Sequence, residues 1–503
     1  MSFPFRWTPV RVVLALFAWL TFTSWLRPLS LPDEGRYVGV AWEMVRSGDW
    51  LVPTLDGLPY FHKPPLFYWI TAISLQLFGV GHLSARVAPL LGATLMGAAL
   101  YLLLRRRADE TTGRDAVLVL GSMPFIFAGA QYANLDMLVA GCITATVAAG
   151  ADAICAMQNR EPHHRSLLLC WAFAGLGVLA KGLIGIVLPV AVLGLWLLLS
   201  WRPSTIFRML WWPGPLLMLA VAAPWFLAMQ QRFPDFLHYF FVYQHFQRFS
   251  QGGFNNVQPF WAYVPAILVL TLPWSLGLWW SARRPEALGS RHLRLSLLMV
   301  VWAAVIVVFF SIPKSKLVGY VLPAVPPLAA LLAVTWRARL RPARFQALVA
   351  GAAVLCVAAI VGVSVADKKT AEPIVAVLKA QRQPGEPVLN VGRYVFDLPL
   401  LLQEPDPIPV VSDWRKDVAT KSDNWAKELY DAGEFNPALA PQVLIDKTLF
   451  RAALCRSSIT WVVTNERTRL PELEGYTPIA STPYLDLFKV DLREAHSRAK
   501  LCG

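Results

Sequence analysis

The sequence predicts a polytopic α-helical membrane protein that carries a small α/β domain at its carboxyl end. Of its 503 residues, 56% are hydrophobic and 16% are charged, against about 25% charged residues in an average soluble protein. Long apolar stretches recur over residues 1–366, whereas residues 367–503 are rich in charge and in turn-forming proline. A helix that crosses a bilayer needs about 20 predominantly apolar residues. Composition and patterning therefore predict a membrane part followed by a polar domain.

The apolar stretches predict about eleven transmembrane helices. The first stretch follows Arg6, is longer than the core of a signal peptide and lacks a small-residue cleavage site, so we expect it to be a helix of the mature chain. Several stretches are shorter than 20 residues and have soft boundaries. The expected spans are residues 9–26, 84–104, 115–130, 134–155, 166–180, 183–200, 209–229, 260–280, 295–311, 317–335 and 345–366.

The loop arginines predict the orientation of these spans. With eleven spans, the arginine-rich loops all fall on one side, which the positive-inside rule makes cytoplasmic. The net charge of +14 therefore reflects membrane topology, and we exclude nucleic acid as a partner. We expect an inner-membrane protein with a cytoplasmic N-terminus. The cytoplasmic arginines are Arg6, Arg11, Arg105, Arg106, Arg107, Arg114, Arg160, Arg165, Arg202, Arg208, Arg283, Arg284, Arg291, Arg294, Arg337, Arg339, Arg341 and Arg344.

We expect a transmembrane domain over residues 1–366 and a periplasmic α/β domain over residues 367–503. Two loops of the first domain, residues 27–83 and 230–259, would also be periplasmic. Tyr37, Val40, Ala41, Met44 and Val45 share one helical face, and Leu66–Phe78 is apolar but too short to span. The first loop therefore predicts two helices that lie along the membrane surface.

The six cysteines divide between the two parts of the chain. Cys142, Cys155, Cys170 and Cys356 fall in apolar spans and suggest core packing, and no spacing suggests a metal site. Cys455 and Cys502 lie in the polar tail, where a periplasmic location would permit a disulfide. Two free thiols are an equal alternative.

Ionisable side chains gather on the predicted periplasmic side. Carboxylates and cations near a membrane face are costly to place unless they are used. Cations there suit a phosphate, and a carboxylate suits a general base or a clamp for an acceptor hydroxyl. The structural alternatives are lysines that reach to lipid headgroups and carboxylates that cap helices. The residues are Asp33, Glu34 and Asp136, with Lys63, Arg86, Lys181, Arg248, Lys314, Lys316, His62, His245 and Tyr320.

Three segments carry a resemblance to a known family. The first loop holds Leu-Pro-Asp33-Glu34-Gly-Arg36-Tyr and Pro-Tyr-Phe-His62-Lys63-Pro-Pro, and later come Asn134-Leu-Asp136 and Lys314-Ser-Lys316-Leu-Val-Gly-Tyr320. Together these resemble the GT-C superfamily of bacterial glycosyltransferases, in particular the aminoarabinose (lipid A) transferases and the protein O-mannosyltransferase-like enzymes. The resemblance covers about residues 9–335.

The resemblance implies a GT-C type fold and an inverting glycosyltransferase that uses an undecaprenyl-phosphate sugar. By matching motif it implies catalytic roles for Asp33 and Asp136, with Glu34 beside them. It implies that the donor phosphate is held by Lys63 and Tyr320 and by Arg248, and we add Lys314, Lys316 and Arg86 from their position on the same side.

The chain departs from the family pattern at two places. The family usually has Glu where His62 stands, and often Glu where Gln244 stands. Both changes remove negative charge near the donor phosphate and raise the hypothesis that His62 and His245 bind a divalent ion. Ordinary hydrogen-bonded histidines are the alternative, because no third ligand is evident.

The leading hypothesis is therefore a glycosyltransferase that moves a sugar, such as 4-amino-4-deoxy-L-arabinose, from a polyprenyl monophosphate to lipid A in the periplasm. A protein or another envelope glycan is the alternative acceptor. A lipid-linked sugar transporter is the alternative of another class. Internal repeats and midplane polar residues, which transporters often show, are not evident in the sequence.

Overall fold

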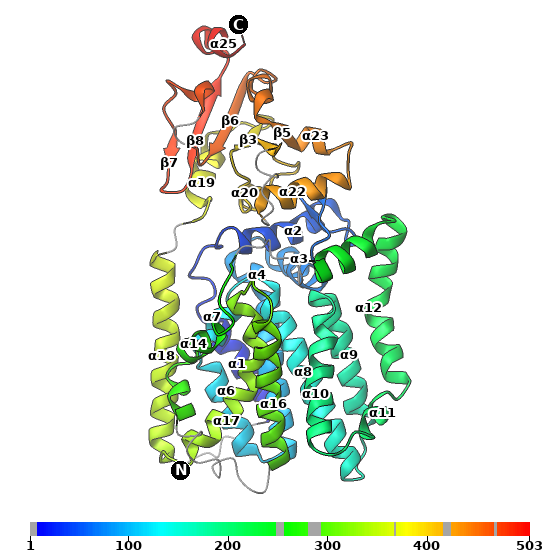
Figure 1. Cartoon of the computed structure of the whole chain (residues 1–503). Helices are drawn as coiled ribbons and strands as arrows, with labels where there is room; N and C mark the ends of the chain where they lie inside the picture. Colours follow the sequence, from blue (N-terminus) through cyan, green and yellow to red (C-terminus); the bar gives the residue numbers. More distant parts are fainter. Residues whose placement is uncertain are drawn as a thin grey trace.

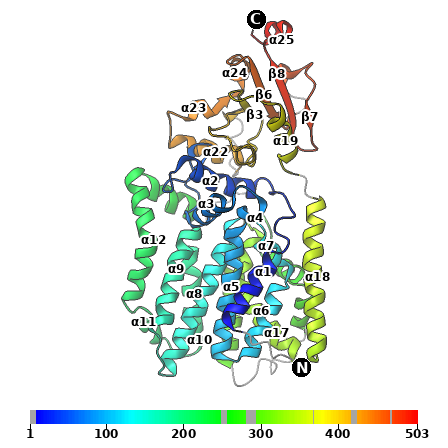
Figure 2. The same ribbon diagram turned by 180° about the vertical axis from the view of Figure 1, so that it is seen from behind.

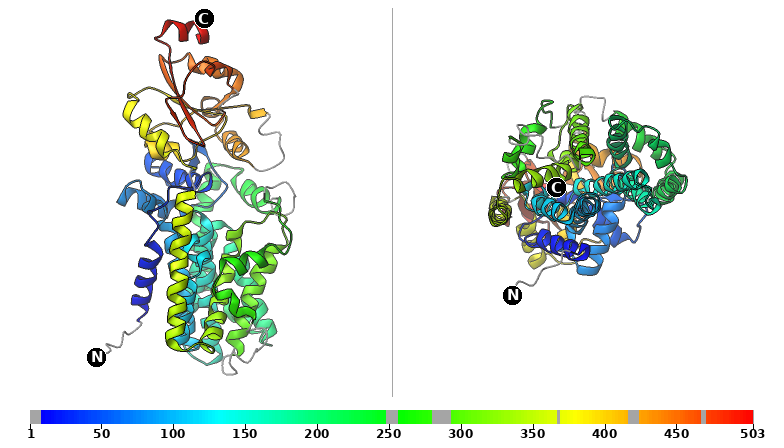
Figure 3. Two further views of the ribbon diagram at one scale, coloured as in Figure 1. Left: turned by 90° about the vertical axis from the view of Figure 1, so that its left-hand side faces the viewer. Right: turned by 90° about the horizontal axis from the view of Figure 1, so that it is seen from below.

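The computed structural model describes residues 8–247, 256–279, 293–366, 369–415, 424–466 and 470–502. It has three layers along one axis: a helical bundle, a layer formed by the first loop, and a sheet domain (Figure 1). The last helix, α25 (Ala495–Cys502), lies at the end of this axis farthest from the bundle (Figure 3).

The bundle contains helices that are long and apolar enough to cross a membrane. Among the described residues there are six, or up to seven if the pair α6 and α7, bent by 68°, is one span. The predicted number of eleven spans is not established by this criterion. The bundle helices are α1 (Pro9–Thr21), α5 (Val87–Arg107), α6 (Glu110–Gly121), α7 (Pro124–Ala130), α8 (Leu135–Gln158), α9 (His164–Lys181), α10 (Ile184–Leu199), α11 (Thr205–Met209), α12 (Pro213–Arg232), α14 (Tyr263–Leu270), α16 (Leu293–Ser311), α17 (Val325–Arg337) and α18 (Pro342–Ala366).

Two predicted spans are not α-helical throughout, although Val318–Arg337 is still one continuous helix long enough to cross a membrane. In the span expected at residues 260–280, α14 ends at Leu270 and a short 3-10 helix, η2 (Trp274–Gly277), follows Pro273. In the span expected at residues 317–335, the chain begins as the 3-10 helix η5 (Val318–Ala324) before α17. Proline removes a backbone donor and obstructs the preceding turn, which explains the break at Pro273.

Close packing of α5 and α8 forms the centre of the bundle. A Cβ atom added to Gly92 would lie 2.6 Å from the backbone of Leu138, and one added to Gly141 would overlap the Gly92 carbonyl. Small residues let two helix backbones approach in this way. The packing fixes the start of α8, which carries Asp136.

The first loop forms the layer between the bundle and the sheet domain (Figure 2). Both helices predicted there are confirmed as α2 (Asp33–Ser47) and α3 (Leu66–Phe78). Val40, Ala41 and Met44 of the predicted apolar face of α2 are fully buried. The layer is completed by the strands β1 (Thr54–Leu55) and β2 (Leu58–Pro59) and by α4 (His82–Ala85). In the second large loop, a π-helix η1 (His238–Gln247) follows α12.

The sheet domain has six strands in the order β5-β4-β3-β6-β8-β7. The first four are parallel, and β8 runs antiparallel to β6 and β7. Cys455 and Cys502 form a disulfide, which ties the last helix to the domain. The strands are β3 (Val388–Val391), β4 (Val410–Ser412), β5 (Leu444–Asp446), β6 (Ile459–Thr464), β7 (Ala480–Ser481) and β8 (Asp486–Asp491). The helices are α19 (Glu372–Gln381), α20 (Leu398–Leu402), α22 (Trp425–Glu434), α23 (Ala440–Val443), η6 (Lys447–Leu449), α24 (Phe450–Leu454), η7 (Pro471–Leu473) and α25 (Ala495–Cys502).

Candidate active site

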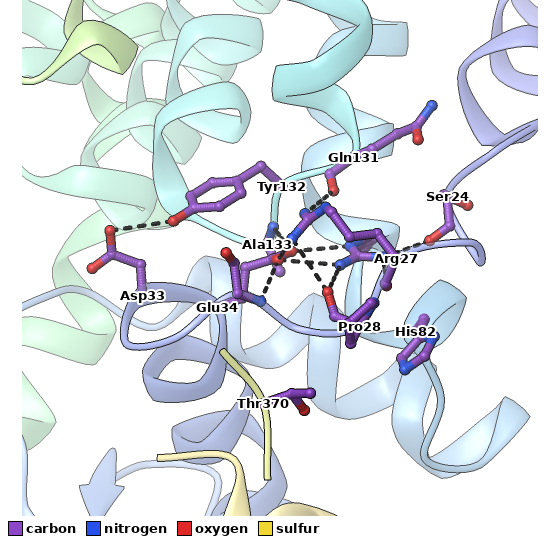
Figure 4. A network of polar contacts seen from close by, with 12 residues as sticks. Ser24, Arg27, Pro28, Asp33, Glu34, His82, Gln131, Tyr132, Ala133 and Thr370 are labelled. Carbon is purple, nitrogen blue, oxygen red and sulfur yellow. Dashed lines mark hydrogen bonds and ion pairs between the residues drawn. The ribbon is translucent and has the colours of Figure 1, made fainter. Parts of the chain in front are cut away.

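Asp33 and Glu34 are the first two residues of α2, yet their side chains lie in different surroundings (Figure 4). The Asp33 side chain is 43% exposed, and the Glu34 side chain is fully buried. Successive residues of a helix point about 100° apart, which separates the two carboxylates. Because one carboxylate is accessible and the other is enclosed, Asp33 and Glu34 have different roles.

Glu34 lies in a closed cage of donors. Arg86 Nε donates to its Oε1 at 2.9 Å, Arg27 Nη1 lies 2.6 Å from its Oε2, and the backbone amides of Ser30 and Ala133 each donate at 2.8 Å. Burial by itself would raise the pKa of Glu34, but the charges and hydrogen bonds of Arg86 and Arg27 outweigh it and lower the pKa. Glu34 is therefore an ionised anchor that holds three segments together. A carboxylate with this environment does not reach a substrate, so the predicted catalytic role of Glu34 has no support in its placement.

Arg86 forms the other half of this anchor. Its Nη1 donates to the carbonyls of Ser24 and Arg27 at 2.6 and 2.8 Å, and its Nη2 donates to Pro28 at 2.9 Å. The side chain is 1% exposed. The predicted contact of Arg86 with a donor phosphate is thus not supported, because its donors are already engaged inside the protein.

Asp33 is the open carboxylate of the pair. Arg36 Nη2 donates to its Oδ1 at 2.8 Å, one helical turn along α2, and Tyr132 Oη donates to its Oδ2 at 3.4 Å. Figure 4 shows the carboxylate turned toward Tyr132 and away from the Glu34 cage. The two contacts fix the carboxylate and leave part of it accessible.

Asp136 lies at the start of α8 and makes a second cluster. Asn134 caps the helix, since its Oδ1 accepts from the Asp136 amide at 2.9 Å. Lys181, the last residue of α9, donates to Asp136 Oδ1, and the Lys181 Nζ lies 4.4 Å from the centre of the Tyr320 ring. A Cβ atom on Gly319 would overlap Asp136 Oδ2, so only glycine lets η5 approach this closely. The cluster joins α8, α9 and η5.

Tyr37 connects the two clusters. Burial is the largest cause that raises the pKa of Tyr37 to about 12, and the charges that act on it belong to Arg36, Asp33, Lys181 and Asp136. Electrostatic interactions of this kind fall off with distance. Charges of the Asp33 cluster and of the Asp136 cluster thus both act on Tyr37, and Tyr132, which contacts Asp33, lies four residues before Asp136 in the chain.

The remaining predicted residues are placed as follows. Lys63 is half-buried and Lys314 is exposed. Lys316 is 6% exposed and donates to the carbonyls of Gln258 and Pro313, so its ammonium holds a loop together. Arg248 lies outside the described residues.

The metal hypothesis concerns His62 and His245. His62 is buried, and its ring stacks on that of Tyr60 with centres 4.6 Å apart. His245 lies on η1, and its side chain is outside the described part of the structure. Among the described residues, no group of three or more His, Cys, Asp or Glu side chains is arranged to hold a metal ion.

Sequence reasoning missed three residues of the site. Arg36 stands in the Asp33 motif, and its i, i+3 spacing on a helix predicts contact with Asp33. Lys181 is predicted only as one of the periplasmic cations that suit a phosphate, and no local signal pairs it with Asp136 across 45 residues. Tyr132 has no sequence signal, because its contact depends on how α7 meets α8.

Comparison with known proteins places these features in a family context. The family described as dolichyl-phosphate-mannose-protein mannosyltransferase matches residues 62–227. A Sodalis glossinidius protein named undecaprenyl phosphate-alpha-4-amino-4-deoxy-L-arabinose arabinosyl transferase 1 is 35% identical over 65% of this chain and 58% of its own length. An Aeromonas salmonicida protein named undecaprenyl phosphate-alpha-4-amino-4-deoxy-L-arabinose arabinosyl transferase is 36% identical over 61% of this chain and 56% of its own length. The chain thus matches less than three fifths of the length of these curated relatives.

A solved structure resembles nearly the whole chain. The structure of ArnT from Cupriavidus metallidurans bound to undecaprenyl phosphate superposes with a TM-score of 0.79 at 24% identity, covering 95% of this chain and 97% of ArnT. The oligosaccharyltransferase of Archaeoglobus fulgidus in the apo form gives a TM-score of 0.51 at 14% identity. At these identities the likeness establishes the fold. The chain therefore has a fold like that of ArnT and, in sequence, resembles the aminoarabinose transferases and the protein mannosyltransferase family.

Proposed function

We propose that the protein is an integral-membrane glycosyltransferase that moves 4-amino-4-deoxy-L-arabinose from undecaprenyl phosphate to lipid A. The observation that carries this proposal is the half-exposed Asp33, which Tyr132 ties to the segment just before Asp136, together with the cluster of Asp136, Lys181 and Tyr320. The names of the curated relatives and the undecaprenyl phosphate bound in the ArnT structure support the donor, and lipid A as the acceptor rests on the resemblance of the sequence motifs. A donor with a long lipid chain requires the reaction to take place at the membrane face, where these residues lie.

The proposed step is a displacement at the anomeric carbon of the sugar. An oxygen of the acceptor forms a bond to the anomeric carbon. At the same time the bond between this carbon and the phosphate oxygen of the donor breaks, and undecaprenyl phosphate leaves with the electron pair of that bond. Lys181, Lys63, Tyr320 and Arg248 would stabilise the charge on the leaving phosphate. Asp33 would orient the acceptor or take its proton, with Asp136 holding Lys181 in place. Inversion at the anomeric carbon follows from a single displacement.

We further propose eleven spans, with residues 1–366 as the transmembrane domain and residues 367–503 as a periplasmic domain. The arginine-rich loops support this orientation. In it the active site faces the periplasm of a bacterial inner membrane. The disulfide between Cys455 and Cys502 also favours an oxidising compartment for the sheet domain.

The test is transfer by the purified protein and by its Asp33→Asn variant. The assay mixes the aminoarabinosyl undecaprenyl phosphate donor with lipid A and measures the mass of lipid A. We expect Asp33→Asn to reduce transfer by at least about a hundredfold, in the range for a lost acid–base group, with donor binding retained. The control is Asp235→Asn, which changes an exposed carboxylate in the second loop and should keep full activity. Full activity of Asp33→Asn would refute the catalytic assignment.

The two alternatives give different products. If lipid A stays unmodified, comparing the envelope glycoconjugates of the host with and without the gene reveals a protein or glycan that has lost one sugar. That result keeps the enzyme class and changes the acceptor. Movement of the donor between leaflets without any transfer would instead support the transporter.

A further inference from the structure

A cavity of about 500 Å³ lies at the end of the bundle opposite the sheet domain. It is formed where α8 ends, where α9 begins and where α11 connects α10 to α12, and α11 is at the far end of the bundle from the sheet in both views (Figures 1 and 2). The cavity and the Asp33 site therefore lie at opposite ends of the bundle. The residues that line it are Met157, Gln158, Arg160, Glu161, His163, Arg202, Ser204, Thr205 and Arg208.

Three arginines make this cavity positively charged. Arg160 follows α8, and Arg202 and Arg208 lie on the connection from α10 to α12 that contains α11, so that two segments supply the three guanidinium groups. All three are exposed, and none makes an ion pair or side-chain hydrogen bond with the described residues. Arginine presents a planar set of donors that matches a phosphate or carboxylate.

Nearby carboxylates do not neutralise these arginines, because other cations already hold them. Glu161 pairs with Arg107 at 2.7 Å. Asp152 pairs with Arg106 at 2.7 Å and with Arg107 at 2.6 Å, and it accepts a hydrogen bond from Ser166. The arginines of the cavity thus keep an excess of positive charge that no described carboxylate neutralises.

The wall of the cavity is held in place by the protein. Trp171 Nε1 donates to the Met209 carbonyl at 3.0 Å, which ties α11 to α9. The rings of His163 and His164 stack with centres 4.5 Å apart, and His164 contacts Trp211 at the same separation. These contacts keep the two arginine-bearing loops together before any ligand arrives.

Aromatic side chains beside the cavity indicate that it borders the lipid. Trp201, Phe207 and Trp212 are 90%, 78% and 71% exposed in the segment that carries Arg202 and Arg208. Tryptophan and other large aromatics are enriched at the headgroup level of a membrane, where lipid phosphates lie. A basic cavity between helix ends at this level is typical of sites that bind anionic headgroups.

We propose that this cavity binds the phosphate of an anionic phospholipid from the leaflet opposite the active site. Arg160, Arg202 and Arg208 would donate to the phosphate oxygens, and the exposed aromatics would lie along the lipid chains. The proposal does not depend on the transferase activity. The same chemistry would also fit free phosphate, so the test must separate the two.

The test measures lipid binding by the purified full chain in detergent, using native mass spectrometry. The probes are dioleoyl phosphatidylglycerol, zwitterionic dioleoyl phosphatidylcholine and inorganic phosphate. The variant Arg160→Gln/Arg202→Gln/Arg208→Gln should bind phosphatidylglycerol at least about tenfold more weakly, since each such arginine is worth about 1 kcal/mol near an anionic membrane surface. Phosphatidylcholine should bind weakly to both proteins.

The matched control is Arg339→Gln/Arg341→Gln/Arg344→Gln, which removes the same charge from the connection between α17 and α18 and from the first turn of α18, at the same end of the bundle. It should bind phosphatidylglycerol as the unchanged protein does. Equal losses in both triple variants would overturn the proposal, because they would indicate general attraction to basic loops. Displacement of the lipid by millimolar inorganic phosphate would identify free phosphate as the ligand and overturn the assignment to a lipid. If the first triple variant does not fold, Arg202→Gln alone should still weaken binding, and unchanged binding by that variant overturns the proposal.

Discussion

Glu428 of α22 accepts two hydrogen bonds from Arg36 Nη1, at 2.5 and 2.7 Å, while Nη2 of the same guanidinium donates to Asp33 at 2.8 Å. The Arg36 and Glu428 side chains are 14% and 7% exposed. A residue of the sheet domain therefore fixes the arginine that fixes Asp33. The sheet domain takes part in positioning the candidate active site.

Replacing Glu428 with Gln should reduce turnover about tenfold while leaving the affinity for the donor almost unchanged. Residues that hold a functional side chain in place, without touching the substrate, typically change activity by about 10–100-fold when they are replaced. The physical reason is that Arg36, freed from Glu428, holds Asp33 less firmly. Removing one partner of a buried pair also leaves an uncompensated charge, so the melting temperature should fall. The measurement is kcat and KM for donor and acceptor, together with a melting curve.

Glu434→Gln, an exposed change on the same helix, is the control for Glu428→Gln and should behave like the unchanged protein. Glu428→Asp should recover part of the turnover. A variant that loses stability but keeps its kcat would show that Glu428 is structural only.

Gly319→Ala should impair transfer strongly at a modest cost in stability. A methyl group at this position overlaps Asp136 Oδ2, so either η5 or the carboxylate must move. Overpacking costs typically about 1–3 kcal/mol, and displacement of Asp136 would also disturb Lys181. The measurement compares activity and unfolding of this variant with those of Gly351→Ala, whose added Cβ meets nothing within 4 Å. Equal activity of the two variants would mean that the geometry at Asp136 is not critical.

The sequence predicted the local features of the site and missed those that depend on distant segments. The helices α2 and α3 were predictable, because their apolar spacing and length are properties of adjacent residues. The loop charges also placed Asp136 and Lys181 on the same side of the membrane. Their ion pair could not be predicted, since it depends on how the ends of α8 and α9 meet.

The different roles of Asp33 and Glu34 were also hidden in the sequence. Both are acidic residues at the start of one helix, and only the arrangement of Arg27 and Arg86 around Glu34 distinguishes them. Likewise, Glu428 lies in a region without a recognisable motif, and its contact with Arg36 spans 392 residues. Such contacts arise from domain packing, which has no periodic signature in the chain.

The Cys455–Cys502 disulfide provides a test of orientation. If the sheet domain is periplasmic, these two thiols should resist a maleimide reagent in whole cells until a reductant is added. The four other cysteines are buried or half-buried in the bundle and should react slowly in the folded protein. Removing the disulfide with Cys455→Ser/Cys502→Ser should cost about 2–4 kcal/mol in unfolding free energy. Labelling of Cys455 and Cys502 in unreduced cells by a maleimide that crosses the membrane would contradict the placement of this pair in an oxidising periplasm.

The contact between His82 and Glu372 should make stability depend on pH. His82 Nε2 lies 2.6 Å from Glu372 Oε1, and its Nδ1 lies 3.2 Å from the Trp25 carbonyl. Both partners only accept hydrogen bonds, so both contacts require the protonated imidazolium. The hydrogen bond with Glu372 is the largest cause that raises the pKa of His82, against opposition from burial and from Arg86.

The sign of the effect follows from this raised pKa. The stabilisation should be fully present below the ordinary pKa of about 6.5 and should disappear as the pH rises through the higher pKa of the folded protein. Because both side chains are partly exposed, we expect no more than about 1 kcal/mol. Burial raises the pKa of Asp397 to about 7. Ionisation of this carboxyl group also makes the folded protein less stable as the pH rises. The informative quantity is therefore the difference between the unchanged protein and His82→Gln in melting curves from pH 6 to 9. That difference should shrink as the pH rises, and a constant difference would show that the imidazolium contributes nothing.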